Sequence, residues 1–185
     1  MRARLTALWV VPLVIAVDQI TKHVVLGSLV LGAPVEVLGS FFRLTFIYNR
    51  GAAFGIHLGS PAVHTVVSIG ALAAVAWLYW SLPAGARLLH AALALVVGGA
   101  IGNIIDRLRF DQVIDFFDVG LGEAWRWPVF NVADSCVSVG VILLILGYRS
   151  VGVDRADPGQ GDSNPAASSQ ASSEASAGPA EPDPA

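Results

Sequence analysis

Three acids of this chain lie where acids are unusual. Asp106 and Asp134 each interrupt a long apolar stretch, and Asp115 lies between them in an apolar and aromatic segment. An ionised side chain at bilayer depth costs roughly 2.5–3.5 kcal/mol even on lenient insertion scales, so such a group is a functional candidate. Two carboxyl groups that meet at a membrane surface predict an aspartyl hydrolase that acts on a membrane-embedded substrate.

Asp115 and Asp134 are the strongest candidates for this chemistry. Asp115 has no basic neighbour to neutralise it, while Asp134 follows a helix start signal at Pro128 and shares a face with Asn131. Two carboxyl groups that meet in a medium of low dielectric constant cannot both ionise, so they share one proton. The ionised member can take a proton from an attacking water while the protonated member donates to a carbonyl oxygen. The spacing leaves open which acid holds the proton.

The other polar residues of the apolar stretches have structural explanations. Asp18 and Lys22 are spaced i, i+4 with the acid first, which predicts an ion pair that supports the structure. Asn103 and Arg107 have the same spacing and share a face. Asp106 stands beside Arg107, where a structural ion pair and a catalytic role are both open.

No metal or other cofactor is expected. The histidines lack a metal-ligand spacing such as H-E-x-x-H, and the single Cys136 excludes a cysteine cluster. The histidines are His23, His57, His64 and His90. A G-x-S-x-G segment, which would indicate a serine nucleophile, is absent.

The composition places this chemistry in a membrane. Of 185 residues, 55% are hydrophobic and only 14% are charged, which is too apolar for a soluble domain of this length. The net charge of −3 comes from residues 151–185, with six acids and one Arg, whereas residues 1–150 hold ten bases and eight acids. Nothing in this distribution predicts nucleic-acid binding. Residues 151–185, rich in Ala, Ser, Pro and acids, should form a disordered tail, which leaves 1–150 as the membrane domain.

Four stretches are long enough to span a bilayer, which needs about 20 residues. They are residues 5–27, 62–81, 87–107 and 130–148. The first contains charged residues and lacks a clear cleavage site, so we expect an uncleaved helix rather than a secretory signal. With four spans both termini share one side of the membrane. The arginines beside the helix ends and the short loop around Pro83 place that side in the cytoplasm.

Both longer connections then lie outside the cytoplasm. The region of about 30–58 contains a predicted hairpin with a two-residue turn at Gly39-Ser40, followed by a strand with alternating apolar side chains. The connection at about 108–129 carries aromatic residues that are typical of the membrane interface. We expect a small extracytoplasmic β-sheet over the helix ends. Near Gly51 we expect a backbone that closely approaches the substrate or the helix ends.

Five motifs extend this prediction. In chain order they are Asp18-Gln19-Ile20-Thr21-Lys22, Asn49-Arg50-Gly51-Ala52-Ala53-Phe54, Gly102-Asn103-Ile104-Ile105-Asp106-Arg107, Val113-Ile114-Asp115-Phe116 and Trp127-Pro128-Val129-Phe130-Asn131-Val132-Ala133-Asp134. Over about residues 10–148 they closely resemble the lipoprotein signal peptidases, the signal peptidase II family. The resemblance implies a bacterial plasma-membrane aspartyl endopeptidase with four transmembrane helices and both termini in the cytoplasm. It also implies that the enzyme removes the signal peptide from a prolipoprotein by cutting just before a diacylglyceryl-modified Cys.

The resemblance also assigns roles by matching motif. It makes Asp115 and Asp134 the catalytic pair and gives Asp18 and Lys22 supporting roles, in which we include Asp106. The residues expected to line the site and position the substrate backbone are Asn49, Gly51, Asn103, Arg107 and Asn131. Because the family is the target of the cyclic peptide globomycin, we expect globomycin binding, by a monomer in contact with membrane lipids. The acidic tail and residues 122–126 depart from the family pattern.

Other classes of protein remain as alternatives. A small proton-coupled transporter would also place acids at bilayer depth, but no internal repeat relates the two helix pairs. A presenilin-like intramembrane protease would also use two aspartates, but none of the apolar stretches carries its G-x-G-D signature. A purely structural four-helix protein would not need so many unpaired polar groups.

Overall fold

The fold is taken from a computed structural model that describes residues 2–51 and 61–153. The elements are α1 (Arg2–Ala7), α2 (Val10–Ser28), β1 (Pro34–Leu38), β2 (Phe42–Asn49), α3 (Pro61–Ser81), α4 (Arg87–Phe110), β3 (Val113–Leu121), β4 (Trp125–Arg126) and α5 (Val132–Val153). Residues Met1–Arg149 form one compact unit. Helix α5 runs past residue 151, where the sequence predicted the tail to begin. The predicted tail from residue 154 onward, and residues 52–58 of the predicted hairpin region, lie outside the described residues.

Within residues 2–51 and 61–153, three helical segments are long and apolar enough to cross a membrane. They are Arg4–Ser28, Ala62–Ser81 and Arg87–Phe110, and a shorter apolar helix covers Val132–Tyr148. All four overlap the stretches predicted from the sequence. Large apolar side chains are exposed on the helices, such as Ile20 at 63% and Trp77 at 72%, while Asp18, Lys22 and Asp106 are buried. This distribution is inverted relative to a soluble protein and fits an outer surface that meets lipid.

The first predicted span is divided into α1 and α2 because of Pro12. Proline has no N–H group, so it cannot donate to the carbonyl group four residues earlier, at Leu8. The N–H of Val11 donates to the Leu8 carbonyl instead, at 3.1 Å, which closes a tighter turn. The sequence predicted a spanning helix over residues 5–27; the span is present as Arg4–Ser28, and the turn divides it into two helices.

Helix α4 packs closely against α2 at two glycines, Gly98 and Gly102. A Cβ atom added at Gly98 would lie 2.8 Å from the Cβ of Val14, and one added at Gly102 would lie 2.5 Å from Asp18 Oδ2. Any larger residue would therefore push the two helices apart. The close approach at Gly102 lets the carboxylate of Asp18 lie against α4.

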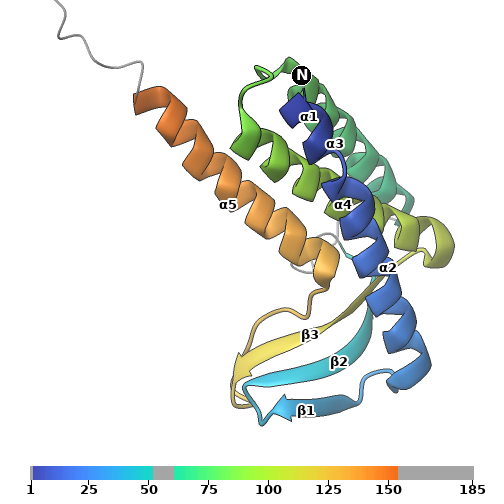
Figure 1. The fold of residues 1–185 in the computed structure, drawn as a ribbon. Helices are drawn as coiled ribbons and strands as arrows, with labels where there is room; N and C mark the ends of the chain where they lie inside the picture. The colour runs from blue at the N-terminus through green and yellow to red at the C-terminus, as the bar shows by residue number, and fades with distance from the viewer. Residues whose placement is uncertain (1, 52–60, 154–185) are drawn as a thin grey trace, which may run out of the picture. The chain divides into compact units, whose positions relative to one another are not determined.

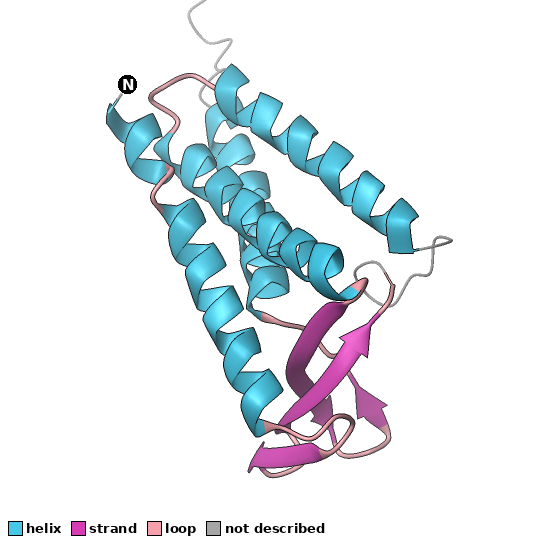
Figure 2. Ribbon diagram, turned by 90° about the vertical axis from the view of Figure 1, so that its right-hand side faces the viewer, coloured by secondary structure: helices cyan, strands magenta, loops and turns pink. Residues whose placement is uncertain are grey.

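The strands form one antiparallel sheet in the order β1-β2-β3-β4 at one end of the helices (Figures 1 and 2). The predicted hairpin is present, but Leu38 pairs with Phe42, so its connection has three residues rather than the predicted two. Gly39 has a φ of +52° in this connection, a conformation that favours glycine. The sheet packs on the end of α2 through a core of Val25, Phe46, Ile114 and Phe116. This core fixes β2 and β3, which both carry site residues.

A cluster of ion pairs connects neighbouring strands of the sheet. Arg43 on β2 donates to both carboxylate oxygens of Glu123, at 2.6 and 3.1 Å. Asp118 on β3 accepts from Arg126 at 2.6 Å and from the Thr45 hydroxyl at 2.7 Å. Burial raises the pKa of Asp118, but these two hydrogen bonds and the charges of Arg126 and Arg43 together outweigh it, and the net pKa lies below its usual value. The cluster thus connects β2, β3 and the turn before β4.

Two local features bring β3 and the start of α5 together. Helix α4 ends at Asp111, whose φ of +57° is left-handed and whose N–H donates to the Arg107 carbonyl. The chain reverses there and enters β3. Further along, the Phe130 carbonyl accepts from the N–H of Phe117 at 2.7 Å, and the Phe130 N–H donates to the Phe117 carbonyl at 3.1 Å. This bridge holds the residues before α5 against β3.

Candidate active site

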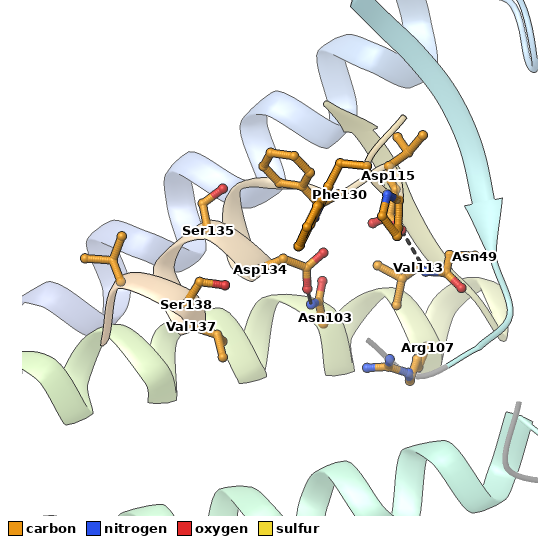
Figure 3. A pocket seen from close by; sticks show the side chains of 14 residues that line it. Asn49, Asn103, Arg107, Val113, Asp115, Phe130, Asp134, Ser135, Val137 and Ser138 are labelled. Atoms are coloured by element: carbon orange, nitrogen blue, oxygen red, sulfur yellow. Dashed lines mark hydrogen bonds between the residues drawn. The ribbon is translucent and has the colours of Figure 1, made fainter. Parts of the chain in front are cut away.

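Asp115 on β3 and Asp134 in the first turn of α5 border the same cavity (Figure 3). The cavity has a volume of about 370 Å³ and is lined mainly by apolar side chains. The polar lining residues are Asn49, Asn103, Arg107, Asp115, Asp134, Ser135 and Ser138. The structure therefore brings together, at one cavity, two acids that are separated in sequence and carried by different elements.

Asp115 is almost fully buried, with 1% of its surface exposed, and its two oxygens have different donors. Asn131 Nδ2 donates to Oδ1 at 2.7 Å, and Asn49 Nδ2 donates to Oδ2 at 2.9 Å. Burial and the nearby charge of Asp134 raise the pKa of Asp115 to about 7, against the opposing effect of the Asn49 hydrogen bond. Asp115 can therefore gain or lose a proton near neutral pH.

Asp134 is held at the start of α5 by two side-chain amides. Asn103 Nδ2 donates to Asp134 Oδ1 at 2.8 Å, as Figure 3 shows. Asn131 Oδ1 accepts from the Asp134 N–H at 2.8 Å, and Asp134 Oδ2 accepts from the Asn131 N–H at 3.3 Å. This reciprocal pair is a capping box, which satisfies free N–H groups at a helix start. The cap fixes both the backbone and the carboxylate of Asp134.

Asn131 connects the two acids. Its Nδ2 donates to Asp115 Oδ1, and also lies 3.0 Å from Asn103 Oδ1. Its side chain is fully buried and contacts protein groups, so it does not line the cavity. The sequence predicted contact with the substrate for this residue, whereas its described contacts are to both members of the acid pair.

Lys22 lies behind the cavity as the centre of a buried polar cluster. Its ammonium group contacts Asp18 Oδ2 at 2.9 Å, Asp106 Oδ2 at 2.8 Å and Asn103 Oδ1 at 2.9 Å. The predicted pair of Asp18 and Lys22 is therefore present. The ion pair considered between Asp106 and Arg107 is corrected, since Asp106 pairs with Lys22. Consecutive helix residues do not face one another, which is why the adjacent arginine is not its partner.

The two acids of this cluster reach the backbone on both sides of the site. Asp18 Oδ1 accepts from the N–H of Ala133 at 3.0 Å, and Asp106 Oδ2 accepts from the N–H of Ile114 at 3.1 Å. Ala133 directly precedes Asp134, and Ile114 directly precedes Asp115. Each member of the acid pair is thus preceded by a residue that the Lys22 cluster holds.

The remaining predicted site residues lie around Asn49. Gly51 is buried, and its N–H donates to Asn49 Oδ1 at 2.9 Å, which turns the amide nitrogen of Asn49 toward Asp115. Gly51 itself is not among the lining residues. Arg107 borders the cavity from α4, on the side of Asn49 (Figure 3). The cavity therefore offers a guanidinium group and two amides beside the acids.

The apolar wall of the cavity was not predicted. It is formed by Trp127-Pro128-Val129-Phe130 before α5 and by Val137 and Val139 on α5, which flank the polar Ser138. A signal for the second run was available, because Ser138 lies at i+4 from Asp134 and must share its helix face. Gln19 was part of a quoted motif but received no role, and it contacts both acids of the Lys22 cluster.

Comparison with known proteins decides the family. A family model described as signal peptidase (SPase) II matches residues 10–149 of the chain. This chain belongs to the signal peptidase II family. The lipoprotein signal peptidase of Burkholderia mallei (strain SAVP1) is 46% identical over 137 residues, which cover 72% of this chain and 81% of the relative. That of Desulforapulum autotrophicum is 44% identical over 139 residues, covering 72% and 85%.

Solved structures agree with membership of the signal peptidase II family. Two similar structures are described as a bacterial membrane enzyme, solved at 2.3 and 1.9 Å resolution. The first has a TM-score of 0.69 at 29% identity and covers 85% of this chain and 93% of its own. The second has a TM-score of 0.69 at 32% identity and covers 77% and 92%. The chain is therefore a membrane peptidase, and the transporter alternative is not supported.

Proposed function

We propose that this member of the signal peptidase II family is an aspartyl endopeptidase with Asp115 and Asp134 as its catalytic residues. The observation that carries the proposal is the shared cavity, where Asn131 connects the two acids through hydrogen bonds. Two carboxyl groups in such a setting share one proton, which gives one general base and one general acid.

The reaction follows from these two roles. The ionised acid takes a proton from a water molecule as the water oxygen attacks the carbonyl carbon of the scissile peptide. The protonated acid donates to the carbonyl oxygen, which forms a neutral tetrahedral intermediate. The C–N bond then breaks as the acid that took the proton from water passes it to the leaving amine, while the other acid takes back a hydroxyl proton and the carbonyl group of the carboxylic acid product re-forms. Asn49, Asn103 and Arg107 would position the substrate backbone beside the acids.

The substrate proposed is a prolipoprotein with a diacylglyceryl-modified Cys. The relatives are named lipoprotein signal peptidases, and the cavity combines an apolar wall with a polar end that holds the acids. Apolar lining suits a substrate that enters from lipid, and the polar end suits a peptide bond. Cleavage would occur just before the modified Cys, and globomycin would compete for the same cavity.

We further propose a topology of four spans, with the shorter α5 as the fourth. Both termini would lie in the cytoplasm of a bacterial cell, and the small sheet and the catalytic pair would lie near the outer face of the plasma membrane. The enzyme would act as a monomer. Residues 1–150 would form the peptidase domain, and 151–185 a tail that takes no part in cleavage.

The test is a cleavage assay with purified protein and a lipidated preprolipoprotein, read by mass spectrometry. The substrate should lose a mass equal to its signal peptide. Asp115→Asn and Asp134→Asn should each abolish cleavage in folded protein, because a neutral amide cannot act as the base or share the proton. Substantial turnover by either variant would remove that residue from the catalytic role. Loss of activity on chelation with EDTA, with rescue by zinc, would contradict the aspartyl mechanism.

A further inference from the structure

Gln19 on α2 contacts the polar cluster behind the cavity through its side-chain amide. Its Nε2 lies 3.0 Å from Asp106 Oδ1 and 3.2 Å from Asp18 Oδ2. It also lies 3.2 Å from the Gly102 carbonyl oxygen on α4. Gln19 therefore bridges the same two acids that Lys22 bridges, and it does so with a neutral group.

The two bridged acids determine where the catalytic residues lie. Asp18 accepts from the Ala133 N–H at 3.0 Å, and Asp106 accepts from the Ile114 N–H at 3.1 Å. These N–H groups belong to the residues directly before Asp134 and Asp115. A change in the distance between the Asp18 and Asp106 carboxylates would therefore displace the start of α5 and β3.

Electrostatics explain why a second bridge is needed. Two carboxylates and one ammonium group carry a formal charge of −1, and all three side chains are at most 2% exposed. Unscreened carboxylates in such a setting repel one another. Lys22 lies between them, and the amide hydrogens of Gln19 supply further donors to both. Without Gln19 the repulsion would be opposed by Lys22 and the backbone donors alone.

We propose that Gln19 is a positioning residue for the peptidase reaction, which together with Lys22 fixes the distance between Asp115 and Asp134. This proposal rests on the proposed function, because it concerns the same catalytic pair. Gln19 does not line the cavity, so it acts through Asp18 and Asp106 and not through the substrate.

The first variant is Gln19→Met, which keeps the length of the side chain and removes its donors. We expect kcat to fall about tenfold to a hundredfold, the range produced by small displacements of catalytic groups, with little change in KM. The matched control is Thr21→Val on the same helix. In the part of the chain that the structure describes, the Thr21 hydroxyl donates within its own helix, to the carbonyls of Val17 and Asp18 at 2.9 and 2.8 Å. This control should keep the wild-type kcat.

The second variant is Gln19→Glu, which keeps the shape and makes the bridge depend on pH. A protonated Glu side chain can still donate to one acid, but an ionised one adds a third negative charge. The charged groups that face it are Asp18 and Lys22 on α2 and Asp106 on α4, with Asp115 and Asp134 beyond them. We expect kcat near the wild-type value at acidic pH and a loss of activity at a lower pH than in the wild type.

The outcomes separate this proposal from the proposed function. If the wild-type protein does not cleave the lipidated preprolipoprotein, the proposed function fails. If the wild type cleaves and both Gln19 variants keep its kcat and pH profile, the positioning role is overturned. A purely structural role predicts a lower melting temperature with an unchanged pH profile per folded molecule, and that result would also overturn the proposal. If Gln19→Met does not fold, the pH profile of Gln19→Glu decides the question.

Discussion

Asn131 Nδ2 donates to Asp115 Oδ1 at 2.7 Å, so one helix-capping residue orients the carboxylate of a neighbouring strand. The same side chain caps the helix that carries Asp134, through its Oδ1. A single amide therefore caps α5 and also orients a carboxylate that we propose to be catalytic. The two roles use different atoms, so they can be separated by mutation.

We predict that Asn131→Ala and Asn131→Ser both reduce kcat by about a hundredfold, because neither side chain reaches Asp115. The two variants should differ in stability. Loss of the cap in Asn131→Ala destabilises by roughly 1 kcal/mol, whereas Ser can still accept from the Asp134 N–H. Cleavage kinetics and thermal melts in detergent measure both effects. A Ser variant with wild-type kcat would show that the amide bridge to Asp115 is unimportant.

The pH dependence of cleavage follows from the raised pKa of Asp115, about 7, caused by burial and by Asp134. A carboxyl group with a raised pKa keeps its proton below that pH and loses it above. The pair then holds one shared proton below pH 7 and loses its general acid above it, so kcat should fall as the pH rises through about 7. This fall, the alkaline limb of the pH profile, reports an apparent pKa of the coupled acid pair and not of one residue.

The companion variant for this profile is Asn49→Ala. The Asn49 hydrogen bond lowers the pKa of Asp115, so its removal should shift the alkaline limb to higher pH. The kcat profile of both proteins is measured with one lipopeptide substrate. The assignment of the alkaline limb to the pair of Asp115 and Asp134 would be contradicted by either of two results. One is a limb that moves to lower pH in Asn49→Ala, and the other is a wild-type kcat that stays level well above neutral pH.

We predict that Asp18→Asn lowers stability more than turnover per folded molecule. The change removes one of the two acids that pair with the buried Lys22, and breaking a buried pair typically costs about 3–5 kcal/mol. The cost should lie at the lower end, because Asp106 remains as a partner at 2.8 Å. An Asn oxygen can still accept from the Ala133 N–H, so the start of α5 should stay in place. An unchanged melting temperature with abolished activity would make Asp18 a functional residue instead.

A fourth prediction compares the tail with the loop at Gly51. Truncation after Val153 should leave cleavage intact, because the residues beyond it carry none of the five motifs and none of the predicted site residues. Gly51→Val should reduce cleavage strongly, since Gly51 is buried and its N–H orients the Asn49 side chain. Both proteins can be compared in one globomycin-sensitive assay. An inactive truncation together with a normal loop variant would contradict the proposed topology and the site.

Much of this fold was predictable because polar residues in apolar helices are few. The i, i+4 spacing of Asp18 and Lys22 predicted their ion pair, and the apolar stretches predicted the helices. The contacts of Asp106 with Lys22 and Ile114 could not be predicted, since they depend on how α2, α4 and β3 pack together. Sequence spacing informs about neighbours within one element only.

The candidate site shows the same limit. Motifs identified Asp115 and Asp134, but no spacing indicated that Asn131 would be buried between them. The division of the first helix was predictable in principle from Pro12, whose missing N–H is a local property. The three-residue connection after Leu38 was not, because a neighbouring bulge in the β1–β2 pairing sets its register.

The ion-pair cluster of the sheet, described above for Arg43 and Asp118, affects how chimeras between members of this family should be designed. Residues 122–126, which we expected to depart from the family pattern, include Glu123 and Arg126, and these are bound to Arg43 and Asp118 outside that segment. A loop transplanted from a relative would leave Arg43 and Asp118 facing foreign side chains. A chimera should therefore exchange this segment together with its partners, Arg43 on β2 and Asp118 on β3.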